Sequence, residues 1–171
     1  PAPAPAPEPD PIVVEVIEPP PVSIFNVTYN NTTNISNSTF NTYTEIMNSA
    51  ISKWESVITG IKQSAELPDY KLSLSVDIIA LGSGILGGTS VYEYNTIDTT
   101  YGKTYPTQAT IELSSSMIAS LANEIRDGGK SSLYYVFLHE VGHALGIGPL
   151  WSFSAILNRP IKVDDAGKKY Y

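Results

Sequence analysis

The sequence predicts an α+β domain, and three observations support this prediction. Apolar residues recur with helical spacing in two long stretches, 39–60 and 131–146. Stretches typical of strands lie before and between them, without the strict alternation of strand and helix that an α/β fold shows. The chain of 171 residues is 42% hydrophobic, which is enough for a core of ordinary size. We therefore expect a strand, a helix, three strands, a short helix and a long helix, in that order.

The first 21 residues form a proline-rich linker or tail, because they hold nine of the 13 prolines. Proline fixes φ and removes a backbone donor, so this segment is predicted to be extended. The stretch 12–18, "IVVEVIE", could pair only at the edge of a sheet. The segment either connects the domain of residues 22–171 to an upstream module or surface assembly, or is a disordered tail.

The first half of the domain contains one strand and one helix. "VSIFNVTY" (22–29) is β-branched and aromatic, which favours a strand. The amphipathic stretch 39–60 predicts a helix, with Ser38 as its N-cap and Gly60 as its stop.

The polar segment between them is rich in N-x-S/T sequons. In a secreted eukaryotic protein these would be glycan acceptors, and in a host without that machinery they form an ordinary polar loop. The sequons begin at Asn26, Asn30, Asn31, Asn34 and Asn37.

The second half of the domain predicts three strands and two helices. "YKLSLSVDIIAL" (70–81) alternates and then becomes wholly apolar, as a central strand does. Residues 82–94 are glycine-rich and then strand-like, and 107–115 alternate again. "SSSMIASLANEIRD" (114–127) predicts a short helix begun by a serine cap, and "GGK" separates it from the long helix 131–146.

Composition excludes several classes of function. The net charge is −7 and the ten Lys and Arg are scattered, which argues against a nucleic-acid surface. Cysteine is absent, so the chain has neither disulfides nor thiolate metal ligands. No apolar run reaches the length needed to span a bilayer.

Both histidines of the chain lie in "FLHEVGHALGIG" (137–148), as the pattern H-E-x-x-H. On a helix, His139 and His143 lie on one face, where their imidazoles can bind one Zn²⁺. Zinc lowers the pKa of a bound water towards neutrality, and Glu140 can accept its proton as it attacks a peptide carbonyl. The alternative is that both histidines lie on a polar helix face and bind nothing.

The residues after the motif only partly follow the metzincin pattern H-E-x-x-H-x-x-G-x-x-H. Gly146 occupies the glycine position, and together with Gly148 it can end the helix with a positive φ. Pro149 occupies the position of the third histidine, so the short form of the pattern fails at its last residue.

"HEVGHALGIGPLW" resembles the leishmanolysin-like metallopeptidases, in which an insertion separates the glycine from the third zinc histidine. "AISKWESVITG", "GILGGTS" and "ATIELSSSMIASL" are also similar to segments of that family, so the resemblance covers roughly residues 40–157. It implies a zincin or metzincin-like N-terminal subdomain, with a twisted mixed β-sheet packed on two long helices, the second of which carries HExxH.

The resemblance also implies the roles of individual residues. His139 and His143 would bind Zn²⁺ and Glu140 would be the general base. The segment 85–90, including Leu86, Gly87 and Gly88, would be the sheet edge that binds a protein or peptide substrate as an added strand. The alternative for these glycines is a tight turn or bulge.

The third zinc ligand has no clear candidate in this sequence. Asp164 and Asp165 follow the motif at a distance where other zincins place an acidic ligand, but their surroundings match no such motif. We therefore expect the domain of residues 22–171 to be incomplete at its C-terminal side. The function expected is that of a zinc endopeptidase acting outside a cell or at a surface, and the alternative is a non-catalytic zincin-fold module of a surface or virion assembly.

Overall fold

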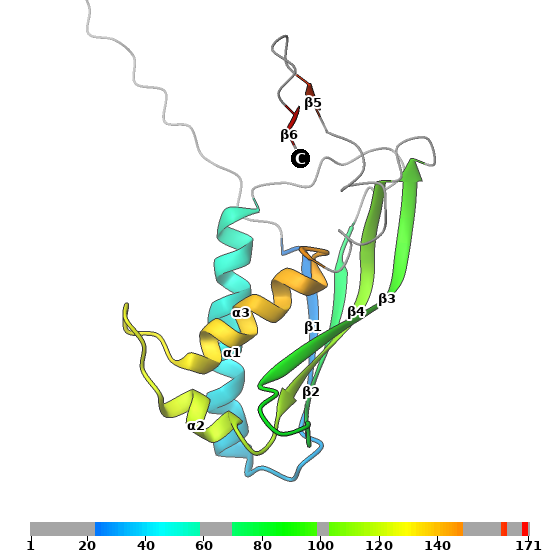
Figure 1. Ribbon diagram of the computed structural model, residues 1–171. Helices are drawn as coiled ribbons and strands as arrows, with labels where there is room; N and C mark the ends of the chain where they lie inside the picture. Colours follow the sequence, from blue (N-terminus) through cyan, green and yellow to red (C-terminus); the bar gives the residue numbers. More distant parts are fainter. Residues whose placement is uncertain (1–22, 59–69, 99–102, 149–161, 164–168, 171) are drawn as a thin grey trace, which may run out of the picture.

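The computed structural model describes residues 23–58, 70–98, 103–148, 162–163 and 169–170. The stretch 12–18, which could pair only at the edge of a sheet, and the helix stop expected at Gly60 lie outside these residues. The chain runs through the following elements (Figure 1): β1 (Phe25–Asn30), α1 (Asn37–Val57), β2 (Leu72–Ile79), β3 (Gly87–Asp98), β4 (Lys103–Ser114), α2 (Ile118–Asn123), α3 (Ser132–Ala144), β5 (Lys162–Val163) and β6 (Lys169–Tyr170).

The four longer strands form one mixed sheet in the order β1-β2-β4-β3. Strands β1, β2 and β4 are parallel, whereas β3 is antiparallel to β4. The expected central strand, β2, is confirmed, because it lies between β1 and β4. Strand β3 is at the edge of the sheet, which places the glycine-rich segment there. The α+β class is therefore confirmed.

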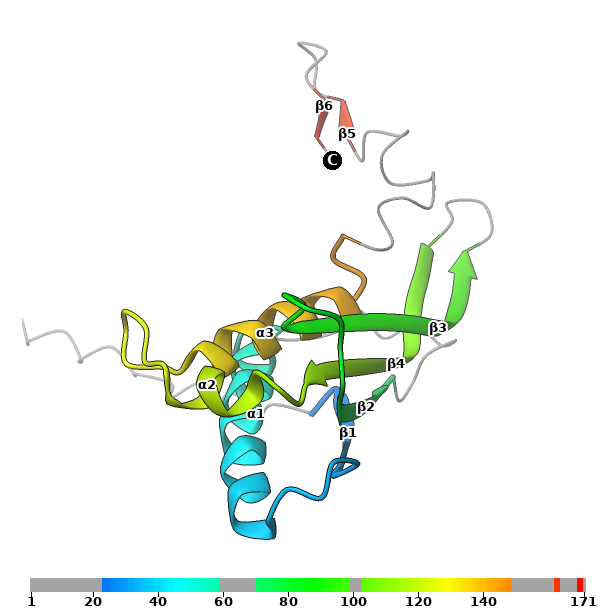
Figure 2. The same cartoon turned by 60° about the horizontal axis from the view of Figure 1, so that its bottom comes forward.

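All three helices lie on the same side of the sheet in both views (Figures 1 and 2). The core forms between them and one face of the strands, because strand residues alternate between the two faces. In β2 every second residue is buried, and the same alternation holds in β4 from Ala109 to Leu113. The core side chains of these two strands are Leu72, Leu74, Val76, Ile78, Ala109, Ile111 and Leu113. The opposite face of β2 carries polar residues such as Ser73 and Asp77, so it tolerates solvent.

Helix α1 buries one stripe of side chains against this core, namely Tyr43, Met47, Ala50 and Ile51. The expected cap at Ser38 is wrong. The helix begins two residues earlier, and the hydroxyl of Ser36 accepts a hydrogen bond from the amide of Thr39. With Ser36 as N-cap, Ile35 and Phe40 occupy the two positions of a hydrophobic staple, and both side chains pack against the core.

The short helix α2 also differs from the expectation at its start. The serines before it do not cap it, since its N-cap is Met117, without a side-chain hydrogen bond. Ser114 instead belongs to β4 and pairs with Ile79 of β2. Ser114 also belongs to the stretch 107–115 whose alternation predicted a strand, and the helix itself begins only at Ile118.

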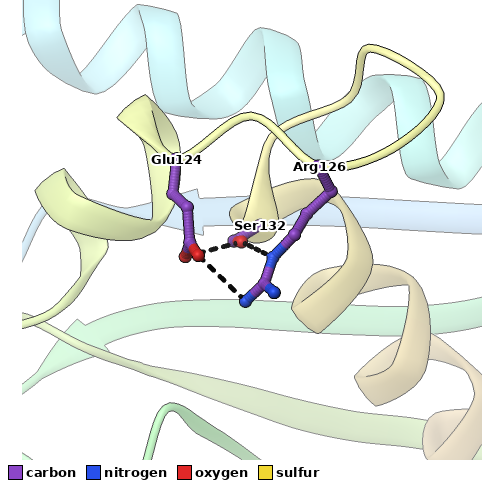
Figure 3. A network of polar contacts seen from close by, with 3 residues as sticks. All are labelled: Glu124, Arg126 and Ser132. Atoms are coloured by element: carbon purple, nitrogen blue, oxygen red, sulfur yellow. Dashed lines mark hydrogen bonds and ion pairs between the residues drawn. The ribbon is translucent and has the colours of Figure 1, made fainter.

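The start of α3 is held by a polar network (Figure 3). The hydroxyl of Ser131 accepts a hydrogen bond from the amide of Tyr134, which caps the helix. Ser132 Oγ donates to Glu124 Oε2 over 2.8 Å and accepts from Arg126 Nε over 2.6 Å. Arg126 Nη2 lies 3.1 Å from Glu124 Oε1. These contacts fix the first turn of the helix that carries both histidines.

The helices found in the described part of the chain lack the combination of length and apolarity that crossing a bilayer requires.

Candidate metal centre

The H-E-x-x-H residues lie on α3, where one helical turn brings the two imidazoles together. The ring centroids of His139 and His143 are 4.4 Å apart, with an interplanar angle of 81°. His139 is exposed and His143 is half-buried, so the pair is open to solvent. Glu140 lies between them in sequence and is only 7% exposed. The helix thus presents the two imidazoles to solvent and directs the carboxylate side chain towards the sheet.

The imidazole of His143 is oriented by the turn that follows α3. Its Nδ1 lies 2.7 Å from the carbonyl oxygen of Ile147, a contact in which Nδ1–H is the donor. In the neutral imidazole the other ring nitrogen, Nε2, then carries the lone pair that a metal needs. Hydrogen bonds of this kind from a metal-binding histidine set its tautomer and raise its basicity as a ligand.

Two glycines shape this turn. Gly146 and Gly148 have φ of +93° and +91°, which confirms that the helix ends on glycines of positive φ. A Cβ on Gly148 would lie 3.3 Å from Cε1 and Nδ1 of His143. Glycine at 148 therefore serves both the backbone conformation and the space that the imidazole occupies.

Helix α3 is anchored to α1 by Trp54. The indole Nε1 donates to the carbonyl oxygen of Leu138 over 2.9 Å. The ring lies against Gly142, because a Cβ there would be 3.3 Å from Trp54 Cζ2. This contact explains why the position before the second histidine is glycine. The sequence showed Trp54 only as one apolar residue in the periodicity of α1.

The carboxylate of Glu140 is held by β3. Thr89 Oγ1 lies 2.7 Å from Glu140 Oε2 and 3.0 Å from the backbone oxygen of Glu140. A Cβ on Gly87 would lie 3.3 Å from Glu140 Cγ. Thr89 belongs to the segment 85–90 that was expected at the sheet edge, but a contact with Glu140 was not predicted for it. Strand alternation places it on the same face as Gly87.

Leu86, Gly87 and Gly88, the expected substrate-binding residues, lie where β3 begins, but they face different ways. The carbonyl of Leu86 accepts a hydrogen bond from the amide of Ser114, so this group is used within the sheet. Gly87 faces Glu140. A Cβ on Gly88 would meet no atom within 4 Å, so this position faces open space.

The donor set fits zinc in kind, since two neutral imidazoles on one helical turn are ligands that Zn²⁺ prefers. Within the described ranges, no group of three or more His, Cys, Asp or Glu is placed to hold a metal ion. Asp164 and Asp165 lie outside those ranges. Comparisons with protein-family models, with curated proteins and with solved structures gave no match to this chain.

Proposed function

We propose that this protein is a zinc-dependent endopeptidase with a zincin-like fold. His139 and His143 would bind the metal, and Glu140 would be the general base. The observation that carries the proposal is the arrangement on α3. Two solvent-accessible imidazoles lie with their ring centroids 4.4 Å apart, and the carboxylate of Glu140 is held by a hydrogen bond at the sheet edge.

The residues of the chain have separate tasks in the proposed reaction. Zinc, when bound, would polarise the scissile carbonyl and acidify the attacking water. Glu140 takes the proton from that water and passes it to the leaving amine. His143 is kept in the tautomer with Nε2 free by its contact with the carbonyl of Ile147. Trp54 keeps α3 at a fixed distance from α1, which stabilises the position of all three residues.

A protein or peptide substrate is the proposed ligand of β3. This strand is an edge strand of the four-stranded sheet, and it contacts α3. It pairs with β4 along one of its two sides. An extended peptide can add to such an edge through main-chain hydrogen bonds. Gly87 lies in β3 beside Glu140, so a peptide bound along this strand would pass close to the proposed general base.

A second candidate function is a non-catalytic module that uses the same fold in a surface assembly. The observation that favours it is that the described residues supply two histidines and no third ligand beside them. The two candidates differ in the metal content that they require. The endopeptidase needs one tightly bound zinc per molecule, whereas the module needs none.

The experiment that tests the proposal uses the intact natural protein with Glu140→Gln, and Glu45→Gln as the matched control. Glu45 is an exposed glutamate of α1. We expect one zinc per molecule in all three proteins by elemental analysis. Cleavage of casein should fall about 10²- to 10⁴-fold in Glu140→Gln, since proton transfer is lost, and stay unchanged in the control. Equal cleavage by Glu140→Gln and the unaltered protein would refute the endopeptidase.

A further inference from the structure

Thr89 is the nearest hydrogen-bond partner of the Glu140 side chain, although 51 residues separate them. Its hydroxyl lies within hydrogen-bonding distance of both Glu140 Oε2, at 2.7 Å, and Glu140 O, at 3.0 Å. A hydroxyl has one proton to donate, and an ionised carboxylate is a stronger acceptor than a carbonyl. The shorter contact is therefore the donated one, and it joins the edge strand to the carboxylate.

Gly87 and Thr89 together form what we call the inward pair of β3. They are two residues apart on one strand, so both face α3. At Gly87 the missing side chain leaves room for Glu140 Cγ, which a Cβ would approach to 3.3 Å. At Thr89 the hydroxyl reaches the end of the same side chain. The inward pair thus contacts Glu140 both along its length and at its tip.

Only one of the two carboxylate oxygens is used by this contact. In the part of the chain that the structure describes, Thr107 Oγ1 is the sole buried side-chain oxygen or nitrogen without a partner. Glu140 Oε1 accepts no hydrogen bond from the described residues. Because it is not among the buried atoms that lack a partner, it retains contact with solvent. Oε2 is therefore fixed while Oε1 stays accessible.

We propose that Thr89 is a positioning residue for Glu140, which rests on the endopeptidase proposed above. Its hydroxyl holds Oε2 and limits the carboxylate to one orientation, so that Oε1 accepts the proton of the attacking water. A displacement of about 1 Å in a reacting group can lower a rate by about 10²-fold. Loss of the hydroxyl should therefore act on kcat, whereas binding of substrate and metal should not change.

The first test compares Thr89→Val, which has nearly the same shape without the hydroxyl, with Thr89→Ser, which keeps it. In the zinc-loaded intact protein we expect Thr89→Val to lower kcat about 10- to 100-fold with KM and zinc content unchanged. Thr89→Ser should restore kcat to within about threefold of the unaltered protein. Thr28 is an exposed residue of β1, so Thr28→Val is the control for replacing a threonine of this sheet by valine. If the Val and Ser variants of Thr89 had equal kcat, the proposal would be wrong.

The second test needs no activity and no metal. The midpoint of thermal unfolding is measured for four proteins: the unaltered protein, Thr89→Val, Glu140→Ala and the double variant. The shift caused by Thr89→Val is then compared between the unaltered background and the Glu140→Ala background. We expect a lower midpoint from Thr89→Val in the unaltered protein and a clearly smaller shift in Glu140→Ala, because the carboxylate partner is already gone. Equal shifts in both backgrounds would show that the hydroxyl does not hold the carboxylate, which overturns the proposal. If the unaltered protein cleaves nothing, the endopeptidase is refuted, and this cycle alone still decides whether Thr89 fixes Glu140.

Discussion

Strand β3 begins with two adjacent glycines that face opposite sides of the sheet, and this offers a matched pair of substitutions. In Gly87→Ala the new Cβ would lie 3.3 Å from three atoms, namely Glu140 Cγ, Leu113 Cδ2 and the carbonyl oxygen of Glu112. In Gly88→Ala it would meet no atom within 4 Å. Neither glycine has a positive φ, so alanine is compatible with the backbone at both positions.

The expected change in the free energy of unfolding follows from comparing the two variants. Replacing glycine by alanine lowers the entropy of the unfolded chain and stabilises by about 0.4–1 kcal/mol where the native conformation allows it. This contribution is common to Gly87→Ala and Gly88→Ala and cancels between them. Only Gly87→Ala adds overpacking, which costs about 1–3 kcal/mol in a filled site. One of its close contacts is backbone of β4, which cannot move without shifting the sheet.

Urea denaturation followed by far-UV circular dichroism measures both free energies of unfolding. We expect Gly88→Ala to be slightly more stable than the unaltered protein, and Gly87→Ala to be less stable by about 1–2 kcal/mol. Gly87→Ala should also lower cleavage of casein, because the displaced Glu140 loses its orientation. Free energies of unfolding within about 0.5 kcal/mol of each other would refute the inferred contact between Gly87 and Glu140.

Three further predictions concern the surroundings of the site. Gly148→Ala should lower zinc affinity about tenfold by displacing His143, whereas Gly84→Ala, with a φ of +82° and no neighbouring atom within 4 Å, should leave it unchanged in zinc titrations. Trp54→Phe should lower the free energy of unfolding by about 1 kcal/mol in urea, since its hydrogen bond to α3 is lost, and a smaller change would contradict the anchoring role. Burial raises the pKa of Tyr70 to about 12, so its contribution to stability is complete below pH 10 and is lost as the pH rises towards 12. Tyr70→Phe should make unfolding less dependent on pH in that range, which denaturation at pH 9 and 11 would show.

Most helices and strands could be predicted from the sequence because their signals are local. Apolar residues at helical spacing mark α1 and α3, and alternation marks β2 and β4. The errors lie at the starts of helices, where several serines compete. Ser36 and Ser38 are equal as caps in isolation, and packing of Ile35 against the core favours Ser36. Ser114 could cap a helix, but the ladder with β2 uses it in a strand.

In the candidate site, too, the features set by local structure could be predicted and those set by long-range pairing could not. His139 and His143 share a face because of helical geometry alone, so the sequence places them together. The partner of Glu140 depends on which strand is the sheet edge and which of its residues face inward. A register shift of one residue would put Gly88 and Ser90 inward in place of Gly87 and Thr89. The sequence does not determine that choice, and for this reason the contact between Thr89 and Glu140 was not predicted.

The burial of Glu140 gives a physical reason why such a partner must exist. The carboxylate of a glutamate residue that is only 7% exposed costs free energy unless a donor satisfies it, because the protein interior solvates charge poorly. The amides of its own helix are engaged in the backbone ladder, so the donor has to come from a neighbouring element. Strand β3 contacts α3, and Thr89 supplies a hydroxyl on the contacting face. A glutamate between two helical histidines that is turned towards a sheet therefore predicts a donor on the inward face of the adjacent strand. In this protein the donor is a threonine two residues after a glycine that leaves space for the glutamate.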